Sequence, residues 1–211
     1  MKGILNLLKR SSQPKQGEDK LDSMMFTTAF ADMDLDDSSV LIPWEARANE
    51  VGAKRLSASR ALKLLQGVWA KDRHMQKFDV TAIQQMERFF EFATVAADRD
   101  VIRQDEYGNF MIVLLAGSIA VDRVQPWGEN LRLTEARPGD ILGEMSLLDS
   151  GIRFSQCRTL TECDIAILGA DALDEMLSVE PLMAANLIGL LARKLSLRLR
   201  VVSARLTEPR S

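Results

Sequence analysis

The residues best suited to chemistry lie within residues 137–155, where glycines, a carboxylate and an arginine follow closely on one another. Gly143 permits a close backbone approach, and the amides of residues 144–146 could form a concave anion site if this turn opens a short helix. Arg153 follows on the next strand. A guanidinium beside free amides binds phosphate, and the Glu144 carboxylate suits a ligand that has a hydroxyl beside its phosphate. The segment therefore indicates a sugar phosphate.

A second interpretation needs no ligand. Glu144 and Arg153 could be an ion pair that holds the turn against the strand, and these residues alone do not decide between the two. The sequence has no Ser/His/Asp set, no cluster of metal ligands and no phosphate-binding glycine loop followed by Lys. We therefore expect no enzymatic activity and no cofactor.

Short strands must position these residues. Between Val95 and Leu168 the apolar residues approach a period of two, and turn signals recur around Gly108, Pro126, Gly139 and Ser150. This pattern predicts an α+β fold: an antiparallel, jelly-roll-like β-roll over about residues 93–168, with flanking helices.

The C-terminal helices are expected over residues 171–206, and Pro181 marks the first turn of a long helix. The apolar residues of this helix advance by threes and fours: Ala184, Ile188, Leu191, Leu195, Leu199, Val202 and Leu206. One roll is too small to cover such a stripe. The sequence therefore predicts a homodimer through residues 181–206.

The first 77 residues divide into two parts. Residues 1–43 carry little periodic hydrophobicity, which predicts a flexible N-terminal segment. Residues 44–77 carry Leu62, Leu65 and Trp69 at helical spacing, which predicts a helical adaptor region that contacts a partner protein. No apolar run is long enough to cross a bilayer, so we expect no transmembrane segment and a cytoplasmic location. The net charge of -3 gives no overall electrostatic attraction for nucleic acid.

Residues 139–148 and the apolar run Phe110–Val121 give the sequence a resemblance to the cyclic-nucleotide-binding domain family. The family includes bacterial catabolite activators and the regulatory subunits of cyclic-AMP-dependent protein kinase, and the resemblance covers about residues 78–206. It implies that Arg153 pairs with the cyclic phosphate and that Glu144 accepts the ribose 2′-hydroxyl. The amides of Glu144, Met145 and Ser146, which follow Gly143, would complete the anion site.

The sequence departs from the family pattern at two site positions. Phe154, followed by Ser155, stands where the family has a small residue, and it could obstruct the phosphate unless strand alternation directs its ring away. Arg198 stands at the position of an adenine-contacting residue of the activator. An Arg can also contact guanine, so cyclic AMP, cyclic GMP and cyclic di-GMP all remain candidate ligands.

We therefore expect a cytoplasmic, homodimeric sensor that binds a cyclic nucleotide or dinucleotide and switches a partner protein through residues 1–77. The alternative is a degenerate roll that binds no nucleotide and acts as a protein-interaction module. The family's transcription factors continue after the long helix into a winged helix-turn-helix, whereas this sequence ends at Ser211. A DNA-binding regulator acting through residues 44–66 is therefore the least favoured interpretation.

Overall fold

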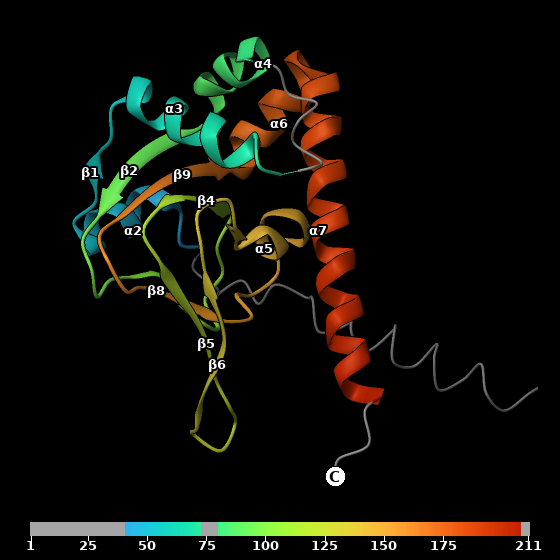
Figure 1. Cartoon of the computed structure of the whole chain (residues 1–211). Coiled ribbons are helices and arrows are strands. Elements are labelled where there is room, and N and C mark those ends of the chain that lie inside the picture. The colour runs from blue at the N-terminus through green and yellow to red at the C-terminus, as the bar shows by residue number, and fades with distance from the viewer. Residues whose placement is uncertain (1–40, 73–79, 208–211) are drawn as a thin grey trace, which may run out of the picture. The chain divides into compact units, whose positions relative to one another are not determined.

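The computed structural model describes residues 41–72 and 80–207, in which two antiparallel sheets form a roll (Figure 1). The five-stranded sheet has the order β1-β2-β9-β4-β7, and the four-stranded sheet has the order β3-β8-β5-β6. The first sheet consists of β1 (Lys54–Arg55), β2 (Glu91–Val95), β9 (Cys163–Gly169), β4 (Phe110–Ala116) and β7 (Ile141–Leu142). The second consists of β3 (Asp100–Ile102), β8 (Gln156–Thr159), β5 (Ile119–Val124) and β6 (Asn130–Ala136).

Strand β4 divides the interior into two hydrophobic cores. It pairs with β9 on one side and β7 on the other, and its apolar residues are buried on both faces. Because side chains alternate along a strand, Met111 and Val113 belong to an outer core beneath the helices, whereas Phe110 and Ile112 belong to an inner core within the roll. The inner face of β4 therefore borders the candidate site.

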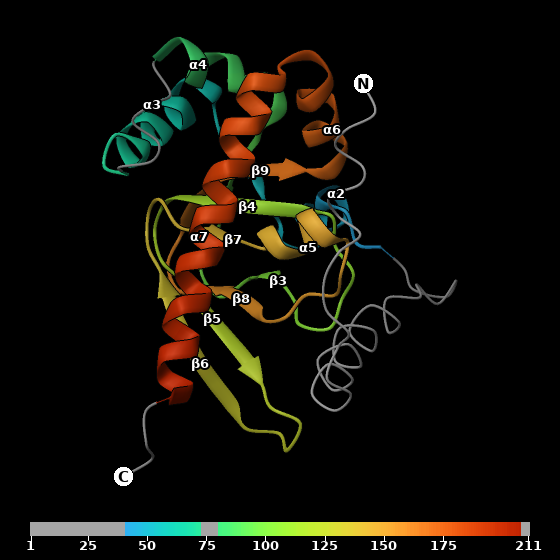
Figure 2. The ribbon, with the colours of Figure 1, turned by 90° about the vertical axis from the view of Figure 1, so that its right-hand side faces the viewer.

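Most of the helices build the outer core. The helices are α2 (Trp44–Val51), α3 (Ala58–Trp69), α4 (Val80–Gln85), the 3-10 helix η1 (Met86–Phe89), α5 (Glu144–Asp149), α6 (Ala170–Val179) and α7 (Pro181–Thr207). Trp44 and Val51 of α2 belong instead to the inner core. Leu65 of α3 packs in the same core as Leu187 and Leu191 of α7. Helix α7 passes beside α5 in both views (Figures 1 and 2), which brings its second half to the predicted site.

The predicted antiparallel roll with flanking helices and a long C-terminal helix is confirmed. The predicted boundary between an adaptor at 44–77 and a domain at 78–206 stays a prediction, although α3 and α7 share one core. Residues 1–40, most of the segment predicted to be flexible, and residues 73–77 of the predicted adaptor lie outside the described residues. Within the described part of the chain, no helix has both the length and the apolar character of a membrane span.

The apolar stripe of α7 is divided in a way that its periodicity did not reveal. Ala184 and Leu191 are fully buried against the protein's own outer core, so they are not available to a second copy. Leu182 is exposed at the first turn of the helix, and the other exposed large apolar residues lie in its later turns: Leu197, Leu199, Val201 and Val202. A dimer seam along the predicted stripe would therefore use the later turns of the helix, because Leu182 does not belong to that stripe.

Candidate ligand site

Gly143 has a backbone conformation that the site requires. It immediately precedes helix α5 and adopts a left-handed conformation with φ of 75°. A Cβ atom at this position would stand 2.6 Å from Nη1 of Arg153 and 2.8 Å from Cδ1 of Ile102. Both the positive φ and the close packing therefore favour glycine, as the sequence predicted from its place before Glu144.

Arg153 is held inside a cage of main-chain and aromatic atoms. Its side chain is 3% exposed, and its Nη1 donates a hydrogen bond of 2.9 Å to the carbonyl oxygen of Gly143. The guanidinium lies over the ring of Phe110 at 4.5 Å from the ring centroid. On another side it packs against Gly108, where a Cβ atom would stand 2.6 Å from Nε. The cage fixes the direction of the guanidinium.

The Arg153 guanidinium retains capacity to bind an anion. Its Nη2 is buried and has no hydrogen-bond partner, and no carboxylate within the described residues forms an ion pair with it. Burial is the main cause that lowers the pKa of Arg153, to about 10, so the side chain remains cationic at neutral pH. A buried cation without a bonded anion is costly, because its lost hydration is not replaced. An anionic ligand bound to Nη2 would compensate for this lost hydration.

Glu144 does not form the ion pair with Arg153 that the sequence left open. Its buried carboxylate accepts a hydrogen bond from Nη1 of Arg198 on helix α7. Arg198 also donates a hydrogen bond of 2.7 Å from Nη2 to the carbonyl oxygen of Ile141. The structure therefore brings Arg198 to the predicted site, where it bonds to the carboxylate predicted to receive a ribose hydroxyl.

Phe154 points away from Arg153. Its side chain is 51% exposed, and the guanidinium of Arg123 lies over its ring at 4.0 Å from the centroid. Arg123 also donates a hydrogen bond to the carbonyl oxygen of Phe154. The sequence placed both residues on a strand, but β8 begins only at Gln156, so they lie in the irregular segment before it. In that segment Arg153 is buried and Phe154 is exposed.

The remaining predicted residues surround the start of α5. Ser146 is buried and Met145 is about half exposed, so their amides, and not the Met145 side chain, are the groups suited to an anion. Ser155 is partly buried. Cys157, on the following strand, is buried, and this burial raises the pKa of its thiol to about 12.

Two residues of the Arg153 cage were not identified as site residues from the sequence. Gly108 was recognised only as part of a turn, and Phe110 only as the start of an apolar strand. Their contact with Arg153 joins positions more than 40 residues apart, which no local pattern encodes.

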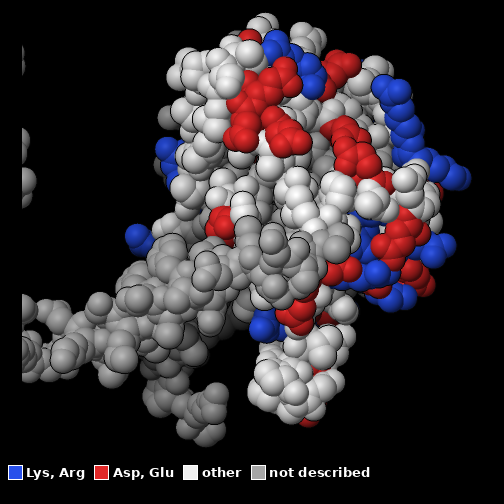
Figure 3. Space-filling view, turned by 180° about the vertical axis from the view of Figure 1, so that it is seen from behind, with Lys and Arg blue, Asp and Glu red and all other residues white. Residues whose placement is uncertain are grey.

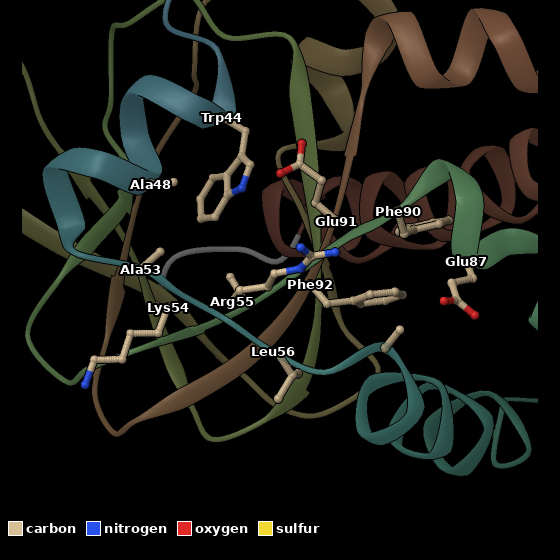
Figure 4. A pocket seen from close by; sticks show the side chains of 12 residues that line it. Trp44, Ala48, Ala53, Lys54, Arg55, Leu56, Glu87, Phe90, Glu91 and Phe92 are labelled. Carbon is tan, nitrogen blue, oxygen red and sulfur yellow. The ribbon is translucent and has the colours of Figure 1, made fainter.

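A separate cavity of about 410 Å³ is lined by residues of α2, β1 and β2 and by Ala58 at the start of α3. Figure 4 shows Trp44, Arg55, Phe90 and Glu91 at its wall. None of the predicted site residues lines it. The site is therefore defined by the chemistry around Arg153 and not by this cavity.

Residues 93–180 match the family model described as the cyclic nucleotide-binding domain. The chain is 32% identical over 95 residues to the CRP-like cAMP-activated global transcriptional regulator of Mycobacterium tuberculosis, a match that covers 45% of this chain and 42% of that protein. It is 27% identical over 107 residues to the cyclic AMP receptor protein of Thermus thermophilus, covering 51% and 50% respectively. The chain thus spans half or less of the length of these relatives.

The fold is also similar to a solved cyclic nucleotide-binding domain from Methylobacillus flagellatus, with a TM-score of 0.67 and 21% identity, covering 72% of this chain and 86% of that one. Residues 93–180 therefore belong to the cyclic nucleotide-binding domain family, as the resemblance in the sequence predicted. The matched proteins of known name are a regulator and a receptor, not enzymes. The matched region contains Arg153 and Glu144, whereas Arg198 lies beyond it.

Proposed function

We propose that this protein is a cytoplasmic sensor that binds a cyclic nucleotide and, as a homodimer, switches a partner protein. The observation that carries this proposal is the buried Arg153 cation, whose Nη2 has no hydrogen-bond partner among the described residues. A cyclic phosphate supplies the anion that such a guanidinium lacks. The amides of residues 144–146 would share the phosphate oxygens.

The names of the relatives support cyclic AMP as the first ligand to test. The Arg198 guanidinium lies at the site and could also contact the O6 and N7 acceptors of guanine. Cyclic GMP and cyclic di-GMP therefore belong in the same set of titrations. The ligand that binds with the lowest Kd identifies the base.

The test of this proposal compares calorimetric titrations of the wild type and of Arg153→Ala. Loss of the charge-assisted contact should weaken binding by about thirtyfold or more, because a desolvated phosphate loses its partner. Arg158→Ala is a matched control, since Arg158 is a half-exposed arginine whose contacts are with Asp98 and Asp100. The control should bind like the wild type. Equal affinity in Arg153→Ala would contradict the proposal.

The homodimer is proposed from the later turns of α7, where Leu199 and Val202 are exposed and extend the predicted stripe. A switched partner would contact the N-terminal region within residues 1–77. DNA binding through residues 44–66 is the least favoured alternative. On the face seen in Figure 3, acidic and basic side chains are interspersed over the described residues. DNA requires a basic surface that neutralises several phosphates.

A specific observation favours the alternative, a roll that binds no nucleotide. Glu144, which would receive the ribose hydroxyl, is already bonded to Arg198. If this pair is permanent, the site offers no carboxylate to a ribose. An absence of binding to all three nucleotides, in a protein that melts cooperatively, would establish the alternative.

A further inference from the structure

The main chain of Arg153 is hydrogen-bonded to residues 105–106, and the next residue, Tyr107, is hydrogen-bonded to Ile42, just before helix α2. The amide of Asp105 donates to the carbonyl of Arg153 at 2.9 Å, and the amide of Arg153 donates to the carbonyl of Glu106 at 2.8 Å. On the other edge, the amide of Ile42 donates to the carbonyl of Tyr107 at 2.9 Å. Residues 105–107 therefore run between Arg153 and the residues immediately before helix α2, with hydrogen bonds to both.

Arg47 of helix α2 holds the same segment through its side chain. Arg47 is 1% exposed, and it donates to the carboxylates of Glu106 and Glu50, the latter at 2.6 Å. Arg103 also bonds to Glu50, which extends the ion pairs into a network between α2 and the segment. The positive charge of Arg47 adds to the burial that lowers the pKa of Arg153, as expected for a charge close to the candidate site. A buried guanidinium that bonds to two carboxylates fixes their positions, here those of Glu50 and Glu106.

Trp44 of helix α2 contacts the cage from a second direction. Its ring meets that of Phe110 edge-on, with centroids 5.5 Å apart and planes at 66°. The guanidinium of Arg153 lies over that same Phe110 ring. Trp44 is 4% exposed and projects from α2 at the wall of the neighbouring cavity (Figure 4). Helix α2 thus reaches Arg153 through a ring contact as well as through ion pairs.

We propose that helix α2 is part of the ligand site, with Arg47 and Trp44 as positioning residues for Arg153. The family match begins at residue 93, so α2 lies outside the region that the family defines. The proposal rests on the function proposed above, in which Arg153 binds the phosphate. A phosphate that binds Nη2 of Arg153 would displace the guanidinium relative to the Phe110 ring and to residues 105–106. Because Trp44 contacts that ring and Arg47 bonds to Glu106, helix α2 would move with them. The movement of α2 would then reach the partner that is proposed to contact residues 1–77.

The first experiment tests the positioning without any nucleotide. The side-chain Nε–Hε resonance of Arg153 is recorded by NMR in the wild type, in Arg47→Ala and in Glu106→Gln. Glu106→Gln keeps the volume and the main-chain bonds, so it remains informative if Arg47→Ala does not fold. Both changes should shift the Arg153 resonance. An unshifted resonance in the folded variants overturns the proposal.

Arg60→Ala is the matched control. Arg60 also joins the N-terminal helices to the roll, through an ion pair of 2.7 Å with buried Asp164, but it does not contact the segment bonded to Arg153. Its loss should lower Tm without shifting the Arg153 resonance. If Arg60→Ala shifts that resonance as much as Glu106→Gln does, the effect is a general loss of stability and the proposal is wrong.

The second experiment measures affinity for cyclic AMP by calorimetry. Arg47→Ala and Glu106→Gln should weaken binding by about tenfold, as coupled neighbours do, whereas Arg60→Ala should stay within about twofold of the wild type. Equal affinity in all variants contradicts the proposal. If the wild type itself does not bind, the proposed function fails, and the ligand-free NMR comparison still decides whether α2 positions Arg153.

Trp44 supplies an independent optical signal. In a protein with Trp69→Phe and Trp127→Phe, the emission of Trp44 should change on titration with cyclic AMP and saturate at the calorimetric Kd. A protein that retains only Trp127 is the control, because Trp127 is 70% exposed and far along the β5–β6 hairpin. A flat Trp44 signal during calorimetrically proven binding would show that α2 does not respond to the ligand.

Discussion

Arg198→Ala removes the guanidinium that joins the later turns of α7 to the predicted phosphate site. The change deletes the hydrogen-bonded ion pair with Glu144 and the bond of 2.7 Å to the carbonyl of Ile141. Bonds to charged groups contribute about 1.5–3 kcal/mol each, and exposed pairs contribute about 0–1 kcal/mol. Because Arg198 is 48% exposed and Glu144 is 4% exposed, we expect the free energy of unfolding to fall by an intermediate amount, about 2 kcal/mol.

A loss of this size should lower Tm by about 4–8 °C in a folded unit of this length. Thermal unfolding followed by circular dichroism measures it, and amide exchange should show faster opening of residues 195–204. Arg200→Ala is the matched control, since Arg200 is an exposed arginine on the same helix with no ion pair among the described residues. If Arg198→Ala melts like Arg200→Ala, the reasoning is refuted.

A double-mutant cycle with Glu144→Gln separates the pair from other effects of the change. If the two side chains stabilise the fold mainly through each other, the double variant should lose about 1–2 kcal/mol less than the sum of the single variants. Strict additivity would show that Arg198 acts through its bond to the main chain.

Phe154→Ala should leave nucleotide affinity within about twofold of the wild type and change stability by less than about 1 kcal/mol, because its ring is exposed; a tighter Kd by calorimetry would show that the ring does obstruct the phosphate. Burial raises the pKa of Cys157 from 9.0 to about 12, so the stability it contributes is present below pH 9 and lost on going to pH 12. In urea unfolding, the free energy of unfolding of Cys157→Ala should therefore decline less than that of the wild type between pH 9 and pH 12, and an identical decline would contradict the raised pKa. The lowered pKa of Arg153 increases stability above pH 10, but it does so in both proteins and does not affect their difference. Charged replacements of Leu199 and Val202 should convert the proposed dimer to monomer in light scattering, and an unchanged dimer would place the interface elsewhere.

Much of the fold was encoded locally and could be read from the sequence. The apolar run of β4, the turns between short strands and the threes-and-fours spacing of α7 each predict one element, because the periods of strand and helix differ. The order Gly143, Glu144 and Arg153 likewise predicted a phosphate site within a short stretch of chain.

The partners of the site residues were decided only by tertiary structure. The sequence left Glu144 and Arg153 as a possible ion pair, yet α7 crosses the roll so that Arg198 reaches Glu144 instead. Arg47 and Trp44 of α2 were not identified at all, although they contact the surroundings of Arg153. Contacts between residues so far apart in the chain depend on where each helix docks, which local periodicity does not specify.

The α7 stripe shows the physical reason most clearly. A period of 3.6 residues identifies which face of a helix avoids water, but it does not identify the surface that covers that face. The sequence therefore predicted one continuous seam from Ala184 to Leu206. The structure buries Ala184 and Leu191 within the same protomer and leaves Leu199 exposed. The apolar face was a property of the sequence, whereas the division of that face between the protein's own core and the exposed surface was a property of the packed fold.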